Sequence, residues 1–278
     1  MSAGGVPVVH LRAVDVWFAD GPHVLHGLDL SIGSGEHWAL LGPNGAGKST
    51  LLALIGAQRH PSRGEVGVLG QQLGRVDLRQ LRETIGTVDV RLRMPAGLSV
   101  ADYVLTGVTQ TVQPLTGRYD ETARALAAEL VGRFGLADLR DRPVSVCSQG
   151  ERARARLVRA LMCKPRLLLL DEPAAGLDLP GRADLLAALE DLPGHDPALA
   201  TVTVAHHLEE LPATTTHVAL LRDGRFVATG TAELLHDTTA LAACFGRPLR
   251  AFTVDGRWYA SAVARPEEDL NTTPAAAR

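Results

Sequence analysis

The 278-residue sequence contains few lysine, cysteine and aromatic residues. Lysine occurs only at Lys48 and Lys164, aromatic residues make up 4%, and the three cysteines show no Cys-x-x-Cys spacing. Scattered cysteines argue against a disulfide framework or a zinc site and favour reduced thiols. The formal net charge of −3 gives no sign of a basic surface, so we expect no nucleic-acid partner.

Long apolar runs are also missing. No run approaches the roughly 18 residues of a membrane span, and the first residues lack the basic and apolar segments of a signal peptide. We therefore expect a protein without spans of its own that can lie against a membrane protein. Apolar residues still make up 46%, enough for a sizeable core in one large or two small domains.

The strongest motif covers residues 42–50, which spell Gly-Pro-Asn-Gly-Ala-Gly-Lys-Ser-Thr. An apolar segment at 36–41 predicts a buried strand before it, and an apolar helix is predicted to follow from Leu51. A phosphate-binding loop requires this strand–loop–helix context. The alternative, an ordinary glycine-rich turn, is disfavoured by the full spacing.

Each position of this loop suits the binding of a nucleotide. Glycines let the backbone turn its N–H groups toward phosphate oxygens. Lys48 supplies a positive charge for the β- and γ-phosphates, and Ser49 offers a hydroxyl to Mg²⁺. The predicted nucleotide-binding residues of the loop are Gly42, Pro43, Asn44, Gly45, Ala46, Gly47, Lys48, Ser49 and Thr50.

A second motif at 167–173, Leu-Leu-Leu-Leu-Asp-Glu-Pro, ends an apolar strand in two acidic residues. Open α/β sheets bind their ligands at the carboxyl ends of such strands. Asp171 is placed to hold Mg²⁺, and Glu172 can act as the general base toward water. The alternative is a strand followed by an acidic capping turn, which the upstream phosphate loop disfavours.

Two weaker motifs are informative mainly because of where they occur along the chain. Ser148 and Gly150 lie at the start of a predicted helix, where a serine is either a simple N-cap or part of a second anion site. His206 and His207 follow a predicted strand, and no neighbouring ligand spacing supports a metal site there. We expect His207 to face solvent and the remaining histidines to form no cluster.

Taken in order, these motifs resemble the nucleotide-binding subunit of an ABC transporter, and the resemblance covers about residues 8–232. It implies that Phe18 stacks on adenine, with Trp17 as the alternative. It implies catalytic roles for Lys48, Glu172 and His206, and magnesium ligation by Ser49 and Asp171. Three further residues would complete a site shared between subunits: Ser148 and Gly150 against the partner's γ-phosphate, and Asp178 at the dimer seam.

The sequence departs from the family pattern in two places. Cys147 and Gln149 replace the commoner leucine and glycine of the signature, which the serine and backbone contacts tolerate. The family usually has a glutamine where Val90 stands, and Asp89, Asp102 or water would have to replace it. We therefore expect slower or differently coupled hydrolysis.

The predicted fold is α/β, with a RecA-like phosphate-loop NTPase core, an N-terminal antiparallel β subdomain and an inserted helical subdomain that carries the signature. Strands are predicted at 8–16, 24–32, 64–72, 85–90, 166–170, 200–205, 217–222 and 225–229, a hairpin at 249–264, and helices at 99–107, 120–134, 150–163 and 183–192. The expected ATPase domain covers 8–264, divided into a core at 8–90 and 158–232, helices at 91–157, an appendage at 233–264, and a disordered tail at 265–278.

The resemblance also implies partners and a location. We expect an ATP- and Mg²⁺-dependent ATPase that forms a homodimer and docks onto a membrane permease through residues 91–107. It would lie in the cytoplasm at the inner face of the membrane. Residues 99–107 and 205–212 are similar to a subgroup that includes molybdate and iron-complex importers.

Two alternatives belong to other functional classes. A soluble ABC ATPase acting in regulation or on a macromolecular partner would usually carry two cassettes, and this chain has one. A phosphate-loop kinase is disfavoured by the signature and by His206.

Overall fold

The computed structural model describes residues 6–18, 21–92 and 94–263. The predicted disordered tail at 265–278 lies outside these residues. In chain order the helices and strands are β1 Val9–Trp17, β2 His23–Ile32, β3 His37–Leu41, α1 Lys48–Ile55, β4 Arg63–Val68, β5 Gln71–Gln72, α2 Leu78–Arg82, β6 Ile85–Asp89, α3 Val100–Thr109, α4 Glu121–Arg133, α5 Gln149–Leu161, β7 Leu167–Asp171, α6 Leu179–Glu190, α7 Leu192–His195, β8 Ala200–Val204, β9 His217–Arg222, β10 Arg225–Thr231, α8 Thr238–Phe245, β11 Leu249–Val254 and β12 Arg257–Ala262.

The central sheet has six strands in the order β10-β9-β3-β8-β7-β6. All neighbours pair in parallel except the β9–β10 hairpin. Every residue of β3, β7 and β8 is buried, as expected for parallel strands covered on both faces. Asp89 and Asp171 are register partners at the ends of β6 and β7, so the sheet brings their carboxylates to the same edge.

A second, antiparallel sheet has the order β2-β1-β4-β5. Its β1–β2 hairpin contains register shifts, and His23 and His26 of β2 stack with ring centroids 3.8 Å apart. Asp15 of β1 lies within hydrogen-bond distance of His23. The prediction that the remaining histidines form no cluster is therefore wrong, because it could not take these shifts of register into account.

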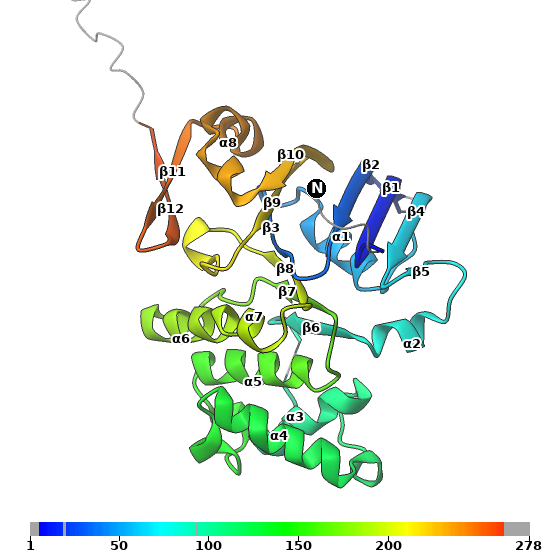
Figure 1. Cartoon of the computed structure of the whole chain (residues 1–278), viewed down its shortest axis with the longest axis vertical. Coiled ribbons are helices and arrows are strands. Elements are labelled where there is room, and N and C mark those ends of the chain that lie inside the picture. The colour runs from blue at the N-terminus through cyan, green and yellow to red at the C-terminus, as the bar shows by residue number, and fades with distance from the viewer. Residues whose placement is uncertain (1–5, 19–20, 93, 264–278) are drawn as a thin grey trace, which may run out of the picture.

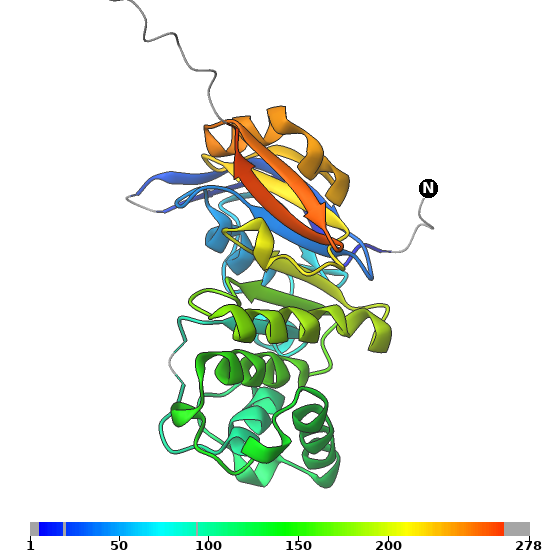
Figure 2. The ribbon, with the colours of Figure 1, turned by 90° about the vertical axis from the view of Figure 1, so that its left-hand side faces the viewer.

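Helices α3, α4 and α5 gather at one end of the molecule, away from the antiparallel sheet and α8 (Figures 1 and 2). They share an apolar core, which includes Val104, Leu130 and Leu157 and continues onto β7 and α6 through Leu168 and Leu185. Each starts at a side-chain cap, because Ser99, Asp120 and Ser148 each accept a backbone N–H from the first turn. No helix of the described residues is long and apolar enough to cross a membrane.

The predicted α/β fold with an N-terminal antiparallel sheet is confirmed. One boundary differs by four residues: α6 begins at Leu179 rather than at 183, because the Asp178 carboxylate accepts the backbone N–H of Gly181 at 2.9 Å. Helices α2, α7 and α8 were not predicted. They are too short, at five, four and eight residues, to show a clear helical period.

Candidate active site

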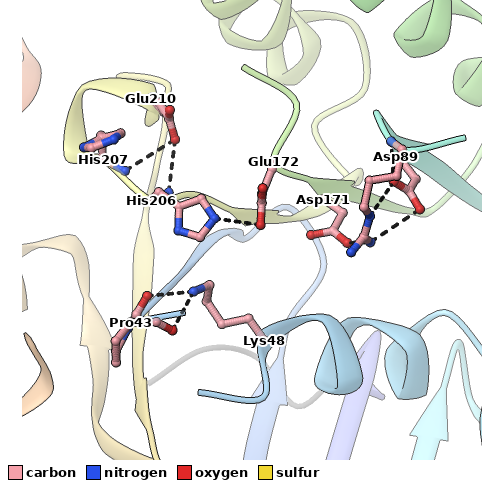
Figure 3. A network of polar contacts seen from close by, with 10 residues as sticks. Pro43, Lys48, Asp89, Asp171, Glu172, His206, His207 and Glu210 are labelled. Carbon is pink, nitrogen blue, oxygen red and sulfur yellow. Dashed lines mark hydrogen bonds and ion pairs between the residues drawn. The ribbon is translucent and has the colours of Figure 1, made fainter. Parts of the chain in front are cut away.

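The loop at 42–47 connects β3 to α1, and its lysine points back into it. Lys48 Nζ donates to the carbonyl oxygens of Gly42 at 2.6 Å and Pro43 at 3.0 Å (Figure 3). The side chain is buried, and this burial lowers the pKa of Lys48, while Glu172 and then Asp171 act in the opposite direction. Two backbone carbonyls of the loop therefore hold the end of the lysine side chain.

Glycine is required where this loop passes close to its neighbours. Gly42 has φ +153°, and a Cβ there would lie 1.9 Å from the Leu221 carbonyl oxygen. Gly47 has φ +104°, and a Cβ there would lie 2.7 Å from Leu25 Cδ2. The loop is thus packed tightly on its inner side, while a Cβ at Gly45 would meet no atom within 4 Å.

The structure brings three predicted elements to one cavity of about 220 Å³. Its walls come from the phosphate loop, the end of β7 and the segment after β8. The lining residues are Val24, Asn44, Gly45, Ala46, Gly47, Lys48, Ser49, Thr50, Glu172 and His206. The order of motifs in the sequence therefore predicted a real spatial cluster.

Glu172 and His206 line this cavity side by side and contact each other. His206 Nε2 lies 2.7 Å from Glu172 Oε1. Glu210 Oε2 accepts the backbone N–H of His206 at 3.0 Å, which fixes the start of that segment (Figure 3). Glu172 itself has φ +53°, an uncommon conformation for a non-glycine residue that is often found at functional sites. His207 is exposed, as predicted.

Arg91 is a residue of this site that the sequence did not predict. Its guanidinium group pairs with Asp171 Oδ2 and with Asp89, whose Oδ1 lies 3.0 Å from Arg91 Nε (Figure 3). The other oxygen of Asp171, Oδ1, is buried and has no hydrogen-bond partner. Burial raises the pKa of Asp171, and Arg91 is the largest influence in the opposite direction.

These residues fit a divalent cation. A buried carboxylate oxygen without a partner is costly and is satisfied by a cation. The Ser49 hydroxyl is close enough to lower the pKa of Asp171 slightly, so both predicted magnesium ligands are together. Oxygen ligands of this kind suit Mg²⁺, and Arg91 occupies the other oxygen of the same carboxylate.

The backbone at Val90, where the family usually has a glutamine, is hydrogen-bonded to the signature helix α5. Arg156 of α5 donates from Nη2 to the carbonyl oxygens of Val90 at 3.3 Å and Leu92 at 3.4 Å. Asp89, one of the two residues proposed to replace this glutamine, is connected to the site because Arg91 pairs with both Asp89 and Asp171. Asp102 instead accepts a hydrogen bond from the Ser99 hydroxyl at the start of α3.

Replacing Arg91 by glutamine is expected to lower the Mg²⁺ concentration that half-saturates ATP hydrolysis. The guanidinium competes with the cation for Asp171, and a partly exposed ion pair corresponds to a roughly two- to fivefold change. The measurement is ATPase rate against Mg²⁺ at fixed ATP. Arg79→Gln, which removes an exposed arginine paired only with Glu83, is the control. An unchanged Mg²⁺ requirement in Arg91→Gln would contradict this competition.

The signature residues line a different cavity, of about 430 Å³. Ser148, Gly150 and Asp178 are among its lining residues, and none of the lining residues belongs to the phosphate-loop cavity. Ser148 forms a capping box, since its hydroxyl accepts the Glu151 N–H at 3.2 Å and its own N–H donates to Glu151 Oε2 at 2.7 Å. The chain therefore does not bring its own signature to its own phosphate loop.

The two aromatic candidates for adenine stacking are exposed at the end of β1. Phe18 is 43% exposed, and the Arg59 guanidinium lies 4.0 Å from its ring centroid. Trp17 packs edge-on against His23. Phe18 lines neither cavity, so its role stays a prediction.

Comparison with known proteins gives the family. The family described as ABC transporter matches residues 25–175. The cobalt import ATP-binding protein CbiO of Rhodobacter capsulatus is 37% identical over 244 residues, which are 85% of this chain and 83% of that protein. The nickel import ATP-binding protein NikO of the same organism is 33% identical over 246 residues, 84% of this chain and 93% of that protein.

A solved structure agrees with these relatives. CbiO1 of Clostridium perfringens, described as part of the ABC transporter complex CbiONQ, has a TM-score of 0.73 and 25% identity and covers 86% of this chain and 94% of its own. The predicted ATPase activity and role in transport are confirmed by this family membership. The chain belongs to the ABC transporter family and is an ATP-binding subunit that hydrolyses ATP to ADP and phosphate to power transport.

Proposed function

We propose that this subunit energises the import of a transition-metal ion or its complex through a separate membrane permease, as an ATP-dependent homodimer at the cytoplasmic face. The substrate class is supported by the cobalt and nickel importers among its relatives. An iron complex, from the subgroup predicted by the sequence, falls within this class. Molybdate, an oxyanion, has no support from those relatives.

One observation carries the proposed dimer: the two halves of the expected ATP site line separate cavities without a shared residue. In a head-to-tail dimer, the phosphate loop of one subunit would face Ser148 of the partner subunit, and two-fold symmetry would create two such sites. The N-terminus of α5 would then direct its positive dipole end at the γ-phosphate. ATP binding would close the dimer, and hydrolysis would open it.

Each catalytic residue has a role that its contacts support. Lys48 would leave the carbonyls of Gly42 and Pro43 for the β- and γ-phosphates. Glu172 would accept a proton from the attacking water, while His206, 2.7 Å away, would hold Glu172 and contact the γ-phosphate. Mg²⁺, held by Ser49 and Asp171, would neutralise the charge that develops on the phosphates.

The division of the chain follows the same scheme. We propose residues 8–90 and 158–232 as the catalytic core with its β subdomain, and 91–157 as the helical part that transmits closure. One link between them is Arg156 of the helical part, which donates to the Val90 carbonyl of the core; α5 also packs against β6 and α6. We propose residues 233–264 as an appendage; its β11–β12 hairpin contacts the segment after β8.

The helical part offers a groove for the permease. A cavity of about 370 Å³ is lined by the small and apolar residues Ala101, Leu105, Ala127, Ala128, Val131 and Ala137, and by the polar and charged residues Ser99, Asp102, Arg124, Arg140 and Asp141. Small and apolar side chains between two helices suit a short helix of a partner. Exposed Leu92, from the predicted docking segment at 91–107, adds apolar surface to the helical part.

Replacing Ala128 by glutamate is expected to abolish co-purification with a co-expressed multi-span permease, because a longer, charged side chain would project into the groove that Ala128 lines. ATP hydrolysis by the isolated subunit should not change. Ala125→Glu is the matched control, since Ala125 is also exposed on α4 but does not line the groove.

Three outcomes separate the possibilities. Loss of the permease with Ala128→Glu alone supports the groove as the docking site. Equal retention by both variants would contradict it. Failure of the unaltered subunit to retain any permease would contradict the proposed docking onto a separate membrane subunit.

A further inference from the structure

We propose that Asp15, His23 and His26 form a binding site for a first-row divalent transition-metal ion, on the outer face of the β1–β2 hairpin. One potential ligand atom from each of the three residues lies within 4.8 Å of the others. Within residues 6–18, 21–92 and 94–263, this is the single group of three or more such side chains with that spacing. It shares no residue with the phosphate-loop cavity.

Two irregularities in the pairing of β1 with β2 bring these side chains together. Val14 pairs with Leu28 and Val16 with Leu25, so Asp15 lies opposite two residues, His26 and Gly27. This is a β-bulge, which turns a side chain to a new direction. A further shift follows between Val16 and Trp17, where Val24 is the extra residue. Two histidines three positions apart, which a regular strand would place on opposite faces, therefore share one face.

The side chains are also held in place. Asp15 Oδ1 accepts the backbone N–H of Gly27 at 3.0 Å and lies 3.0 Å from His23 Nε2. Trp17 packs edge-on against the His23 ring, with centroids 5.6 Å apart. Such supporting contacts orient the ligands of a metal ion and reduce the ordering needed when it binds.

The donor set selects the kind of ion. Two imidazoles and one carboxylate suit Zn²⁺, Ni²⁺, Co²⁺ or Fe²⁺, and not Mg²⁺, which prefers oxygen ligands. Insertion of the ion would replace the proton between Asp15 and His23. Arg225 of β10 lies near enough to His26 to act on its charge, so it would repel the cation and limit its affinity.

The site has a short connection to the phosphate loop. The His26 backbone N–H donates to the Gly224 carbonyl oxygen at 2.9 Å, and the Gly224 N–H donates to Ala46 of the loop at 3.0 Å. Val24, between the two histidines, lines the nucleotide cavity. An ion bound to His26 is therefore expected to stiffen the contact between β2, the β9–β10 turn and the loop.

Titration of the nucleotide-free, tag-free chain with Co²⁺ in excess Mg²⁺ tests the site through its absorption spectrum. Mg²⁺ keeps oxygen-rich sites filled. We expect one Co²⁺ per chain, without a thiolate charge-transfer band, and at least tenfold weaker binding in His23→Asn and in His26→Asn. His10→Asn, which changes an exposed histidine on the same hairpin, should bind Co²⁺ as the unaltered chain does. Arg225→Gln should bind it more tightly.

Equal Co²⁺ affinity in the two ligand variants and in His10→Asn would overturn the proposal, as would the absence of binding below millimolar Co²⁺. Thermal unfolding in the presence of a chelator checks that the variants are folded. Because the three ligand residues are exposed or half-buried, the unfolding midpoints of the variants should match that of the unaltered chain. A second measurement uses amide hydrogen exchange. Ni²⁺ should slow exchange in residues 22–30 of the unaltered chain and not of His26→Asn, and no slowing in either would count against the site.

Discussion

Replacing Glu172 by glutamine is expected to reduce ATP turnover by about 10²- to 10⁴-fold while ATP still binds. The amide keeps the size of the side chain and can still bond to His206, but it cannot accept the proton of the attacking water. ATP would then remain bound and hold two subunits together. Phosphate release measures the turnover, and light scattering with and without ATP measures the mass, which should double with ATP.

The matched control for this variant is Glu209→Gln. Glu209 lies in the segment after His206, but its carboxylate accepts only the Ala260 backbone N–H, at 3.3 Å, and an amide oxygen can do the same. Turnover in Glu209→Gln should match that of the unaltered chain. A Glu172→Gln protein that stays monomeric with ATP would contradict the proposed dimer, and one that keeps normal turnover would contradict the role of Glu172.

Replacing Ser148 by aspartate is expected to abolish the ATP-dependent dimer, whereas Ser148→Asn should keep much of it. Both residues are good N-caps, so the start of α5 should hold in each. Only aspartate adds a negative charge where the γ-phosphate of the partner would lie. We expect at least a hundredfold difference in ATPase rate between the two variants, because like charges at that distance repel strongly in a site shielded from water.

Comparing the two Ser148 variants distinguishes a loss of γ-phosphate binding from a loss of folding. A substitution at Gly150 would not make this distinction. A Cβ at Gly150 would lie 2.9 Å from Gly181 Cα, so Gly150→Ala would push α5 away from α6. The two Ser148 variants should unfold at similar temperatures. Equal ATPase rates in both would show that no phosphate comes near this residue.

Local motifs predicted most of the nucleotide site. The phosphate loop follows one apolar segment, and Asp171 and Glu172 end another. Because both segments are buried as parallel strands of one sheet, their carboxyl ends lie at the same edge of that sheet. Their roles came from short-range spacing together with order along the chain. The contact of His206 with Glu172 could be expected in the same way, because it follows β8, the neighbour of β7.

Other features of the structure depend on the register in which two strands pair, which no local sequence pattern reveals. Arg91 reaches Asp171 because β6 and β7 end at paired positions, and nothing in its own surroundings in the sequence indicates this. The Asp15–His23–His26 cluster depends on two shifts in the β1–β2 pairing. The strand prediction was correct there, but the alternation of a regular strand would place the two histidines on opposite faces. Asp178 had a predicted role at a dimer seam, and the structure adds its local role as the cap of α6.

If each ATP site is made by two subunits, two inactive proteins with defects in different halves of the site should restore activity when they are mixed. Lys48→Ala removes the charge in the phosphate loop, and Ser148→Asp blocks the signature. A head-to-tail dimer of one chain of each kind contains one site in which both halves are intact. We expect ATP hydrolysis, absent from each protein alone, to appear on mixing and to be greatest at equal amounts. A rate no higher than the sum of the separate proteins at every ratio would contradict it.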